Sequence, residues 1–427
     1  MQSIDLLRKN PEVLKEDLKK RRQNHLVELV DEARQKDDSW RKIKQEEDEL
    51  RHKRNEISSK INKTKKEGGD IQPLIEKAKE YPQRIEQLQQ RRENLKAERD
   101  RLLRRLPNQT HNSVPFGESD EDNVPVKHWG EPRKPDFELL PHNRLAEKLG
   151  VADFERSAKI SGSGFYFLTG DLGLLNQALI QFVIHQLVRK DYTYQEPPLM
   201  LRREAYETGV SMEDFEEVMY ELKDEDAYLI ATSEAPMLSQ FKDETLSEDD
   251  LPIKRCAYSM CFRKEVGSHG VDTKGLYRTH QFNKVEQIIV SKPENSWKYH
   301  EELQENAERI HRQLGLPYRV VNCCTGDLGN FAAKKFDIEA WMPRQDAYKE
   351  TCSNSNYTDY QARRANIKMH RKETNDYIHP HTLNCTGVAT SRVMVAILEN
   401  YQREDGTVEV PEVLRPYMFG KKVIRPQ

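Results

Sequence analysis

The sequence predicts an α+β fold, with an N-terminal antiparallel coiled-coil hairpin of helices followed by a larger domain that mixes helices and strands. Two patterns favour this class. A seam with alternating steps of four and three residues continues through the N-terminal quarter of the chain, and short β-rich runs alternate with helical stretches after about residue 135. With 427 residues, the chain is too long for one ordinary domain. We therefore expect a helical arm over residues 1–106, a linker over 107–134 and a second domain over 135–427.

The hairpin, expected over about residues 26–106, is predicted by seam residues on both sides of a turn. The second helix carries the seam Leu74, Ala78, Tyr81, Ile85, Leu88, Arg92, Leu95, Arg99, Leu102 and Leu106. The first helix places on a compatible stripe Trp40, Ile43, Leu50, Ile57 and Ile61, interrupted by Glu47 and Arg54. The glycine-rich run KKEGGD at 65–70 separates the two, so the helices must run antiparallel. Pro82 predicts a kink or a late start of the second helix.

The end of the hairpin next to this turn is strongly basic. Residues 51–66 contain one acidic residue, Glu56, and seven basic ones: Arg51, Lys53, Arg54, Lys60, Lys63, Lys65 and Lys66. A phosphate backbone would bind such a surface in a salt-dependent way. A solvated coiled-coil face is an equally good interpretation of the charge alone.

The overall composition sets limits on partners and location. The net charge of −3 provides no general attraction to nucleic acid, so a nucleic-acid site has to come from local clustering. None of the six cysteines forms a CxxC pair, and we expect no structural zinc. The N-terminus has no apolar run of signal-peptide length, and no stretch is long enough to span a membrane. These features predict a soluble, cytoplasmic protein with no membrane partner.

The second domain contains a strand, a polar loop and a returning strand over residues 261–290. Arg263 and Arg278 would be brought together by this hairpin, where two guanidinium groups could clamp a polyphosphate from two sides. Neighbouring glutamates could accept hydrogen bonds from an amine. A solvated charged hairpin is the plainer interpretation. No GxGxxG or GxxxxGK[ST] loop is present, which argues against a Rossmann or P-loop nucleotide site.

The short segments FRKE, GLYRTHQF and KVE in this region resemble motif 2 of class II aminoacyl-tRNA synthetases, in the form found in the seryl-tRNA synthetase family. The basic-ended arm and the connector over 106–134 are also similar to that family. The resemblance implies a mainly antiparallel sheet flanked by helices. It also implies a motif 1 over 176–198 that builds a homodimer and a motif 3 over 381–400.

The resemblance assigns an ATP site with Mg²⁺ as its cofactor. The implied ATP-binding residues are Arg263, Lys264, Glu265, Arg278, Thr279, Phe282, Glu350, Thr351, Cys352, Ser353 and Arg392. Arg263 at the α-phosphate and Arg392 at adenine and the γ-phosphate are the catalytic pair. Glu350 and Ser353 offer the hard oxygen ligands that Mg²⁺ prefers. Strand alternation alone leaves open whether Phe282 supports adenine or belongs to the core.

The resemblance also assigns an amino-acid pocket. Its residues are Thr232, Ser233, Glu234, Arg263, Glu286, Asn384 and Thr386. A hydroxylated zwitterion needs a carboxylate for its ammonium, for which Glu286 is the candidate, and a short polar partner for its hydroxyl, for which Thr386 is suitable. Without this context, either threonine would more simply be a strand or cap hydroxyl.

The resemblance implies that the chain activates L-serine with ATP to seryl-adenylate and transfers the seryl group to the 3′-terminal adenosine of tRNA(Ser), with tRNA(Sec) open as a second acceptor. His269 and His280 are not favoured as general bases, because the adenylate phosphate could take the proton. The alternatives are an RNA-binding or regulatory paralogue without activity, a ligase that charges a carrier protein, and a synthetase for another small amino acid.

Overall fold

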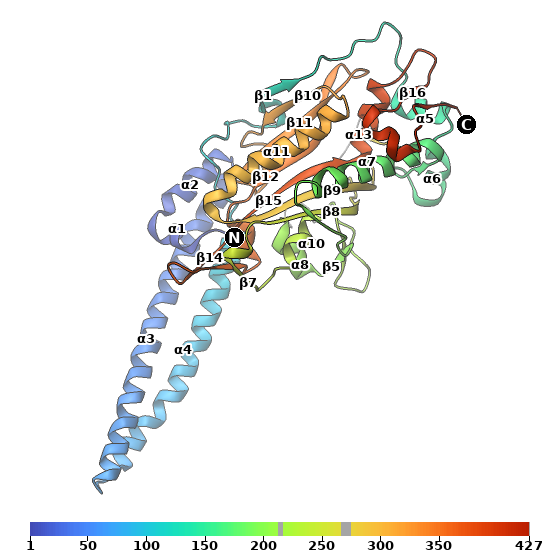
Figure 1. Cartoon of the computed structure of the whole chain (residues 1–427). Helices are drawn as coiled ribbons and strands as arrows, with labels where there is room; N and C mark the ends of the chain where they lie inside the picture. Colours follow the sequence, from blue (N-terminus) through green and yellow to red (C-terminus); the bar gives the residue numbers. More distant parts are fainter. Residues whose placement is uncertain (212–216, 266–274, 427) are drawn as a thin grey trace. The chain divides into compact units, whose positions relative to one another are not determined.

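The computed structural model describes residues 1–211, 217–265 and 275–426. They form two compact units, Met1–Gln109 and Thr110–Gln427, and each is described by itself (Figure 1). The segment that was expected to be a linker falls mostly in the second unit, where it contributes a strand.

The first unit consists of helices, two of them long. The bounds are α1 (Ile4–Lys9), α2 (Pro11–Lys20), α3 (Val27–Lys66) and α4 (Gln72–Arg105). The long helices α3 and α4 run antiparallel as the seam predicted (Figure 1). Ile85 and Leu88 of α4 and Ile43 and Ile57 of α3 are buried along the seam. Helix α4 begins at Gln72 and continues through Pro82, so the proline does not mark its start.

The charged residues that interrupt the seam pair with each other across it. Glu47 is 3% exposed, and its carboxylate lies 2.8 Å from Arg92 Nε on the opposite helix. Asp37 is 1% exposed and accepts a hydrogen bond of 2.8 Å from Arg99, also on the opposite helix. A misregistered hairpin would leave these charges unpaired in the seam. The two pairs therefore favour one register over its neighbours.

The second unit is built on an eight-stranded sheet. Its strand order is β1-β10-β11-β12-β15-β9-β8-β4. All neighbours are antiparallel except β4 and β8, which are parallel. The strands span β1 (Val124–Trp129), β4 (Thr193–Gln195), β8 (Ile253–Phe262), β9 (Gln281–Ser291), β10 (Tyr318–Asn322), β11 (Lys334–Met342), β12 (Ala347–Asn356) and β15 (His381–Ala389). The predicted α+β fold with a mainly antiparallel sheet is confirmed.

Helices and shorter strands complete this unit. The helices are α5 (His142–Lys148), α6 (Phe154–Ser161), α7 (Gly170–Val188), α8 (Arg203–Gly209), α10 (Glu234–Ser239), α11 (Ser296–Gln313), α12 (Tyr360–Arg364) and α13 (Thr390–Asn400). The small sheets pair β2 (Ala152–Asp153) with β3 (Phe167–Leu168), β5 (Met200–Leu201) with β6 (Tyr228–Leu229), β16 (Val408–Glu409) with β17 (Val423–Ile424), and β13 (Lys368–Arg371) with both β7 (Thr245–Ser247) and β14 (Asp376–Ile378).

The two faces of the large sheet have different roles. Helices α7, α11 and α13 contribute to one hydrophobic core with the sheet, and α7 and α11 lie in front of it in Figure 1. Val285 and Ile289 of β9 point into this core. Because side chains alternate along a strand, Phe282, Lys284 and Glu286 point to the opposite face. The charged side chains of Lys284 and Glu286 therefore lie on the face of the sheet that is turned away from the helix-covered core.

Candidate active site

A cavity of about 320 Å³ lies at the polar face of the large sheet. Strands β9, β12 and β15 and the first turn of α13 supply much of its lining. The predicted site residues that line it are Thr232, Glu234, Arg263, Glu265, Arg278, Thr279, Phe282, Glu286, Glu350, Thr351, Cys352, Ser353, Asn384, Thr386 and Arg392. Ser233 and Lys264 are not among the lining residues. Residues far apart in sequence are thus brought to one cavity.

The predicted phosphate-binding arginines lie in this cavity. The guanidinium of Arg263 lies 5.3 Å from the ring centre of Phe282, and its Nε donates to the carbonyl of Ala231 at 3.3 Å. Arg278 lies 3.8 Å from the carboxylate of Glu265. The ring of Phe282 therefore belongs to the cavity and not to the helix-covered core. The loop predicted between these two arginines includes residues 266–274, among them His269, and these lie outside the described residues.

Arg392 and Glu350 form an ion pair in the same cavity. Arg392 Nη1 lies 3.0 Å from Glu350 Oε1, and the guanidinium packs over the ring of Tyr277 at 5.2 Å. Burial alone would raise the pKa of Glu350, but the charges of Arg392, Lys335 and Arg263 outweigh it and lower that pKa. Glu350 is thus held as a carboxylate.

An ionised Glu350 and the nearby Ser353, both lining the cavity, form an oxygen donor set of the kind that Mg²⁺ takes together with phosphate oxygens and water. Ser353 reaches this place on β12 directly opposite Asp337 of β11. The donor chemistry therefore fits the predicted ion.

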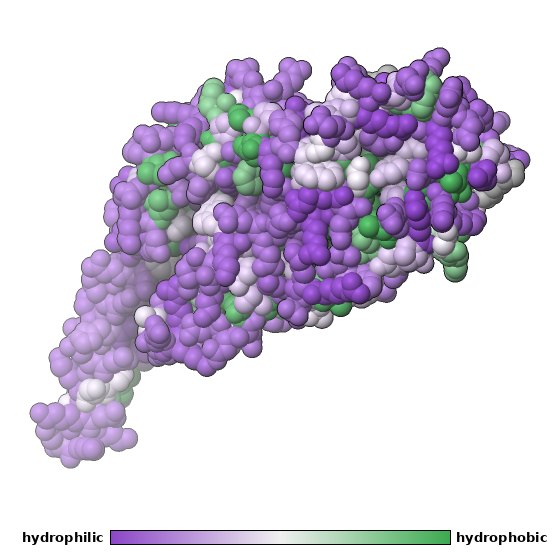
Figure 2. All heavy atoms as spheres, turned by 45° about the horizontal axis from the view of Figure 1, so that its top comes forward, coloured by the Kyte–Doolittle hydropathy of each residue, from purple (hydrophilic) through white to green (hydrophobic). Residues whose placement is uncertain are grey.

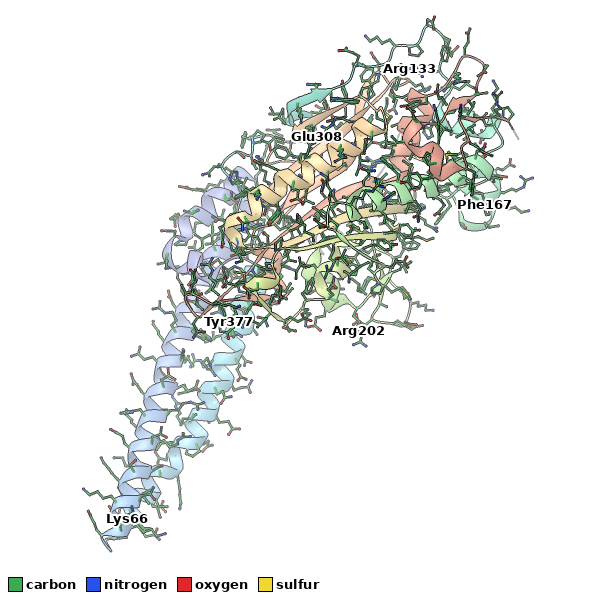
Figure 3. All side chains as sticks on the ribbon, viewed as in Figure 1. Lys66, Arg133, Phe167, Arg202, Glu308 and Tyr377 are labelled. Carbon is green, nitrogen blue, oxygen red and sulfur yellow. The ribbon has the colours of Figure 1, made fainter. Side chains whose placement is uncertain are left out.

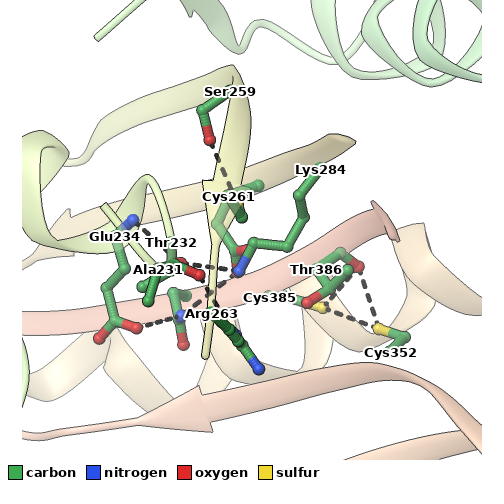
Figure 4. Close-up of polar contacts among 12 residues, drawn as sticks. Ala231, Thr232, Glu234, Ser259, Cys261, Arg263, Lys284, Cys352, Cys385 and Thr386 are labelled. Atoms are coloured by element: carbon green, nitrogen blue, oxygen red, sulfur yellow. Dashed lines mark hydrogen bonds and ion pairs between the residues drawn. The ribbon is translucent and has the colours of Figure 1, made fainter. Parts of the chain in front are cut away.

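The predicted amino-acid residues lie in the same cavity, and Figure 4 shows Arg263 among several of them. Glu286 is fully buried, and Thr386 lies directly opposite it on the neighbouring strand β15. Lys284 Nζ lies 2.5 Å from Glu286 Oε2 and donates to Thr232 Oγ1 at 2.7 Å. Asn384 Nδ2 donates to Glu286 Oε1 at 3.2 Å. The carboxylate of Glu286, the hydroxyl of Thr232 and the amide of Asn384 thus belong to one network, and Thr386 lies beside it on β15.

A second buried carboxylate, Glu234, belongs to the same network. It accepts from Asn384 Nδ2 at 2.8 Å and from Gln361 Nε2 at 2.6 Å. Burial and the nearby charge of Glu286 raise the pKa of Glu234 to about 7. Burial also raises the pKa of Glu286, although Lys284 opposes this effect. The cavity therefore crowds two carboxylates into a place with little water.

Several lining residues were given no role by the sequence analysis. Lys284 is the first residue of the KVE segment. Its spacing of two residues from both Phe282 and Glu286 could have placed it on the same strand face as these two predicted site residues. Tyr277 belongs to the GLYRTHQF segment. Its hydroxyl donates to the backbone carbonyl of Glu350 at 3.1 Å. No local pattern pointed to Gln361, because only the packing of α12 brings it to the carboxylate of Glu234.

A group of potential metal ligands lies beside the cavity. Ligand atoms of Cys323, Asp327 and Asp337 lie within 4.8 Å of one another. The ammonium of Lys335 is already 3.1 Å from Asp327 and 3.2 Å from Asp337, and burial raises the pKa of the Cys323 thiol. The group is therefore better suited to its own lysine than to a metal ion.

In the first unit, the predicted tRNA-binding residues follow the last third of α3. Lys53, Lys60, Lys63, Lys65 and Lys66 are exposed, and Lys66 lies at the far end of the hairpin (Figure 3). Arg51 and Arg54 are half-buried, and Arg51 pairs with Glu47 at 2.7 Å. Figure 2 shows mostly hydrophilic side chains along this hairpin.

Comparison with known proteins agrees with both units. Residues 1–110 match the family described as seryl-tRNA synthetase N-terminal domain, and residues 217–401 match the class II tRNA synthetase core domain for G, H, P, S and T. A serine–tRNA ligase of Methanoregula boonei is 50% identical over 99% of this chain and 100% of its own length. The chain belongs to the seryl-tRNA synthetase family.

Solved structures of the same family have the same fold. Seryl-tRNA synthetase from Pyrococcus horikoshii, complexed with ATP, superposes with a TM-score of 0.94 at 46% identity and covers all of both chains. The cytoplasmic serine–tRNA ligase of Naegleria fowleri, in complex with AMP, gives a TM-score of 0.89 at 34% identity, covering 100% of this chain and 99% of that one. Across the described residues, no helix has the length and apolar character needed to cross a bilayer.

Proposed function

We propose that this protein is a serine–tRNA ligase that activates L-serine with ATP and transfers it to tRNA. The observation that carries the proposal is that one cavity holds two chemically different sets of groups. Arg263, Arg278 and Arg392 suit a polyphosphate, whereas Glu286 and Thr386 suit a hydroxylated amino acid. The family relatives named serine–tRNA ligase, which match along the whole chain, support the same reaction.

In the first step, a carboxylate oxygen of serine attacks the α-phosphorus of ATP and the bond to pyrophosphate breaks. Negative charge grows on the phosphate oxygens, so a guanidinium fixed at this point stabilises the transition state more than the ground state. Arg263 is the residue proposed for that position. Arg278 and Arg392 would hold the outer phosphates, and the ring of Phe282 would support adenine. Most of the rate gain then comes from positioning and charge neutralisation.

Glu350 and Ser353 are proposed to hold Mg²⁺ together with phosphate oxygens of ATP. When bound, the ion would neutralise phosphate charge. Arg392 pairs with Glu350 at 3.0 Å, so the arginine and the carboxylate lie close enough to serve the same phosphates.

Selectivity for serine would come from Glu286 at the ammonium and Thr386 at the hydroxyl. A buried polar pocket rejects an analogue that lacks the matching hydroxyl by about 10⁴-fold, because its own groups lose their partner. Alanine should therefore be a very poor substrate, and threonine has to be excluded by space.

In the second step, the 3′-terminal ribose hydroxyl of tRNA takes the seryl group and AMP leaves. The basic end of α3 is proposed to bind the tRNA backbone. We propose tRNA(Ser) as the acceptor, with tRNA(Sec) a further acceptor to be tested. A homodimer built through motif 1 and a cytoplasmic location complete the proposal.

The direct test is ATP–pyrophosphate exchange with purified protein in the presence of serine, threonine, alanine or glycine. We expect exchange with serine and at most traces with the other three. No exchange with serine, in protein that still binds ATP, would overturn the proposal in favour of a paralogue without activity.

A second test separates the arm from the cavity. Replacing residues 40–100 with a short glycine–serine loop should leave serine-dependent exchange nearly intact and abolish aminoacylation of tRNA(Ser). Equal loss of both reactions would mean that the arm has a structural role only.

A further inference from the structure

Lys284 places an ammonium group of the protein itself among the proposed amino-acid-binding residues. Its side chain is 9% exposed and reaches from β9 between two proposed substrate-binding groups (Figure 4). Nζ lies 2.5 Å from Glu286 Oε2 and 2.7 Å from Thr232 Oγ1. These are the contacts that the α-ammonium of a bound amino acid would be expected to make.

The acceptors around Lys284 leave little room for a second ammonium. A hydroxyl oxygen has two acceptor sites, and Thr232 Oγ1 accepts from Lys284 Nζ and from the backbone N–H of Glu234 at 3.3 Å. Glu286 accepts from Asn384 through Oε1 and faces Lys284 through Oε2. A substrate ammonium that uses Thr232 therefore has to replace that of Lys284.

The charges lead to the same conclusion. Glu234 and Glu286 are 9% and 0% exposed, and two such carboxylates need nearby cations to remain ionised. Lys284 provides one of these cations in the empty protein, and an incoming ammonium would provide the same charge. Both together on one carboxylate would repel each other.

We propose that Lys284 is a placeholder: its ammonium occupies Thr232 and Glu286 until the ammonium of the amino acid takes them over. This inference rests on the proposed function, since it assumes an amino acid as the ligand of Thr232 and Glu286. The displaced lysine needs a new anion, and the carboxylate of an amino acid brings one. Lys284 thus makes the site selective for zwitterions over simple amines.

Serinol tests this selectivity, because it has the ammonium and hydroxyl groups of serine but no carboxylate. A subsite that is free a tenth of the time or less binds its ligand about tenfold more weakly or worse. Replacing Lys284 with methionine, which has similar length and no charge, should therefore make serinol binding at least about tenfold tighter. Serine should gain less than serinol, because its carboxylate loses the ammonium of Lys284 with which it would pair in the wild type.

The binding is measured by calorimetry for wild type, Lys284→Met and Lys292→Met, above the pKa of about 7 of Glu234. Lys292→Met is the matched control, because Lys292 follows the last residue of the same strand and pairs with Glu248 at 3.4 Å outside the cavity. Its serinol affinity should equal that of wild type. If Lys284→Met binds both serinol and serine no better than wild type, Lys284 is a fixed partner of Glu286 and the placeholder is overturned.

Loss of one buried cation could prevent folding of the single variant. The double variant Lys284→Met with Glu234→Gln removes one positive and one negative charge and should show the same gain for serinol; no gain there also overturns the proposal. Wild-type serine binding and exchange are measured in the same series. A wild type that does not use serine refutes the proposed function, whereas an active wild type without a gain in the variants refutes the placeholder alone.

Discussion

Buried charges occur both in the arm and in the cavity, but their surroundings differ. In the arm, the buried carboxylate of Glu47 lies 2.8 Å from Nε of Arg92 on the opposite helix, so it has a cation across the seam. In the cavity, Glu234 and Glu286 lie in one hydrogen-bond network, and Lys284 forms an ion pair with Glu286. The arm gives each of its buried carboxylates its own cation on the opposite helix, whereas Glu234 and Glu286 share the ammonium of Lys284.

The directions of the pKa shifts express the same contrast. In the arm, burial alone would raise the pKa of Asp37, but its hydrogen bonds from Arg8 and Arg99 outweigh burial and lower it. In the cavity, burial and Glu286 raise the pKa of Glu234 to about 7. The ionised Asp37 with its two arginines therefore stabilises the fold near neutral pH. The ionised Glu234, which lies near a second carboxylate, destabilises the fold, and such a group is typical of a binding site.

The largest effect is expected where a cavity charge touches the reaction. Arg263→Ala should lower serine-dependent exchange by about 10²- to 10³-fold, about 3 to 4 kcal/mol, because the α-phosphate loses its guanidinium. The thermal unfolding temperature should change little. The matched control is Arg202→Ala, an exposed arginine that points away from the protein (Figure 3). Retained exchange in Arg263→Ala would remove Arg263 from catalysis.

The second prediction concerns Glu234 and pH. Its pKa is about 7 in the folded protein and near 4.5 when exposed, so between these values only the folded state holds the proton. Stability should therefore fall as pH rises through this window, by about 3 kcal/mol. Urea unfolding at both ends of the window should show this loss in wild type and much less of it in Glu234→Gln. Glu131→Gln, at an exposed site, should behave as wild type. The same loss in Glu234→Gln would assign it to other groups.

A smaller effect is expected from breaking a matched pair in the arm. Glu47→Ala leaves Arg92 in the seam without its partner and should destabilise the hairpin by about 2 kcal/mol, less than a fully buried pair because Arg92 is 27% exposed. The double variant Glu47→Leu with Arg92→Leu should recover most of this loss. Helical circular dichroism during urea unfolding measures both. If the double variant is no more stable than the single one, the seam depends on the pair itself.

The smallest effect on stability is expected at the exposed end of α3. Replacing Lys63, Lys65 and Lys66 with alanine should change the unfolding free energy by less than about 0.5 kcal/mol. tRNA binding should nevertheless weaken and depend less steeply on salt, because fewer counterions are released. The matched control removes three exposed lysines from the other end of the unit, Lys9, Lys19 and Lys20. Equal weakening in both variants would mean that total charge, and not the hairpin end, governs binding.

The sequence alone was sufficient for features that depend on near neighbours. The seam residues from Ile85 to Leu102 predicted the hairpin, since every third or fourth residue of a helix shares a face. The strand–loop–strand segment and its short motifs predicted the family and the phosphate-binding role of Arg263 and Arg278. These signals repeat over a few residues, so no knowledge of distant contacts was needed. Strand alternation in this segment, by contrast, left open whether Phe282 faces the site or the core.

Only the tertiary structure decided which groups meet. Thr232, Lys284 and Asn384 come from different parts of the chain, and their hydrogen bonds exist because the sheet places β9 beside β15. The pairing of Glu47 with Arg92 and the high pKa of Glu234 likewise depend on burial and on charges distant in sequence. Residue types and spacing therefore determined the candidates for the chemistry. Packing decided their partners, because electrostatic interactions act through space and depend on how much water remains.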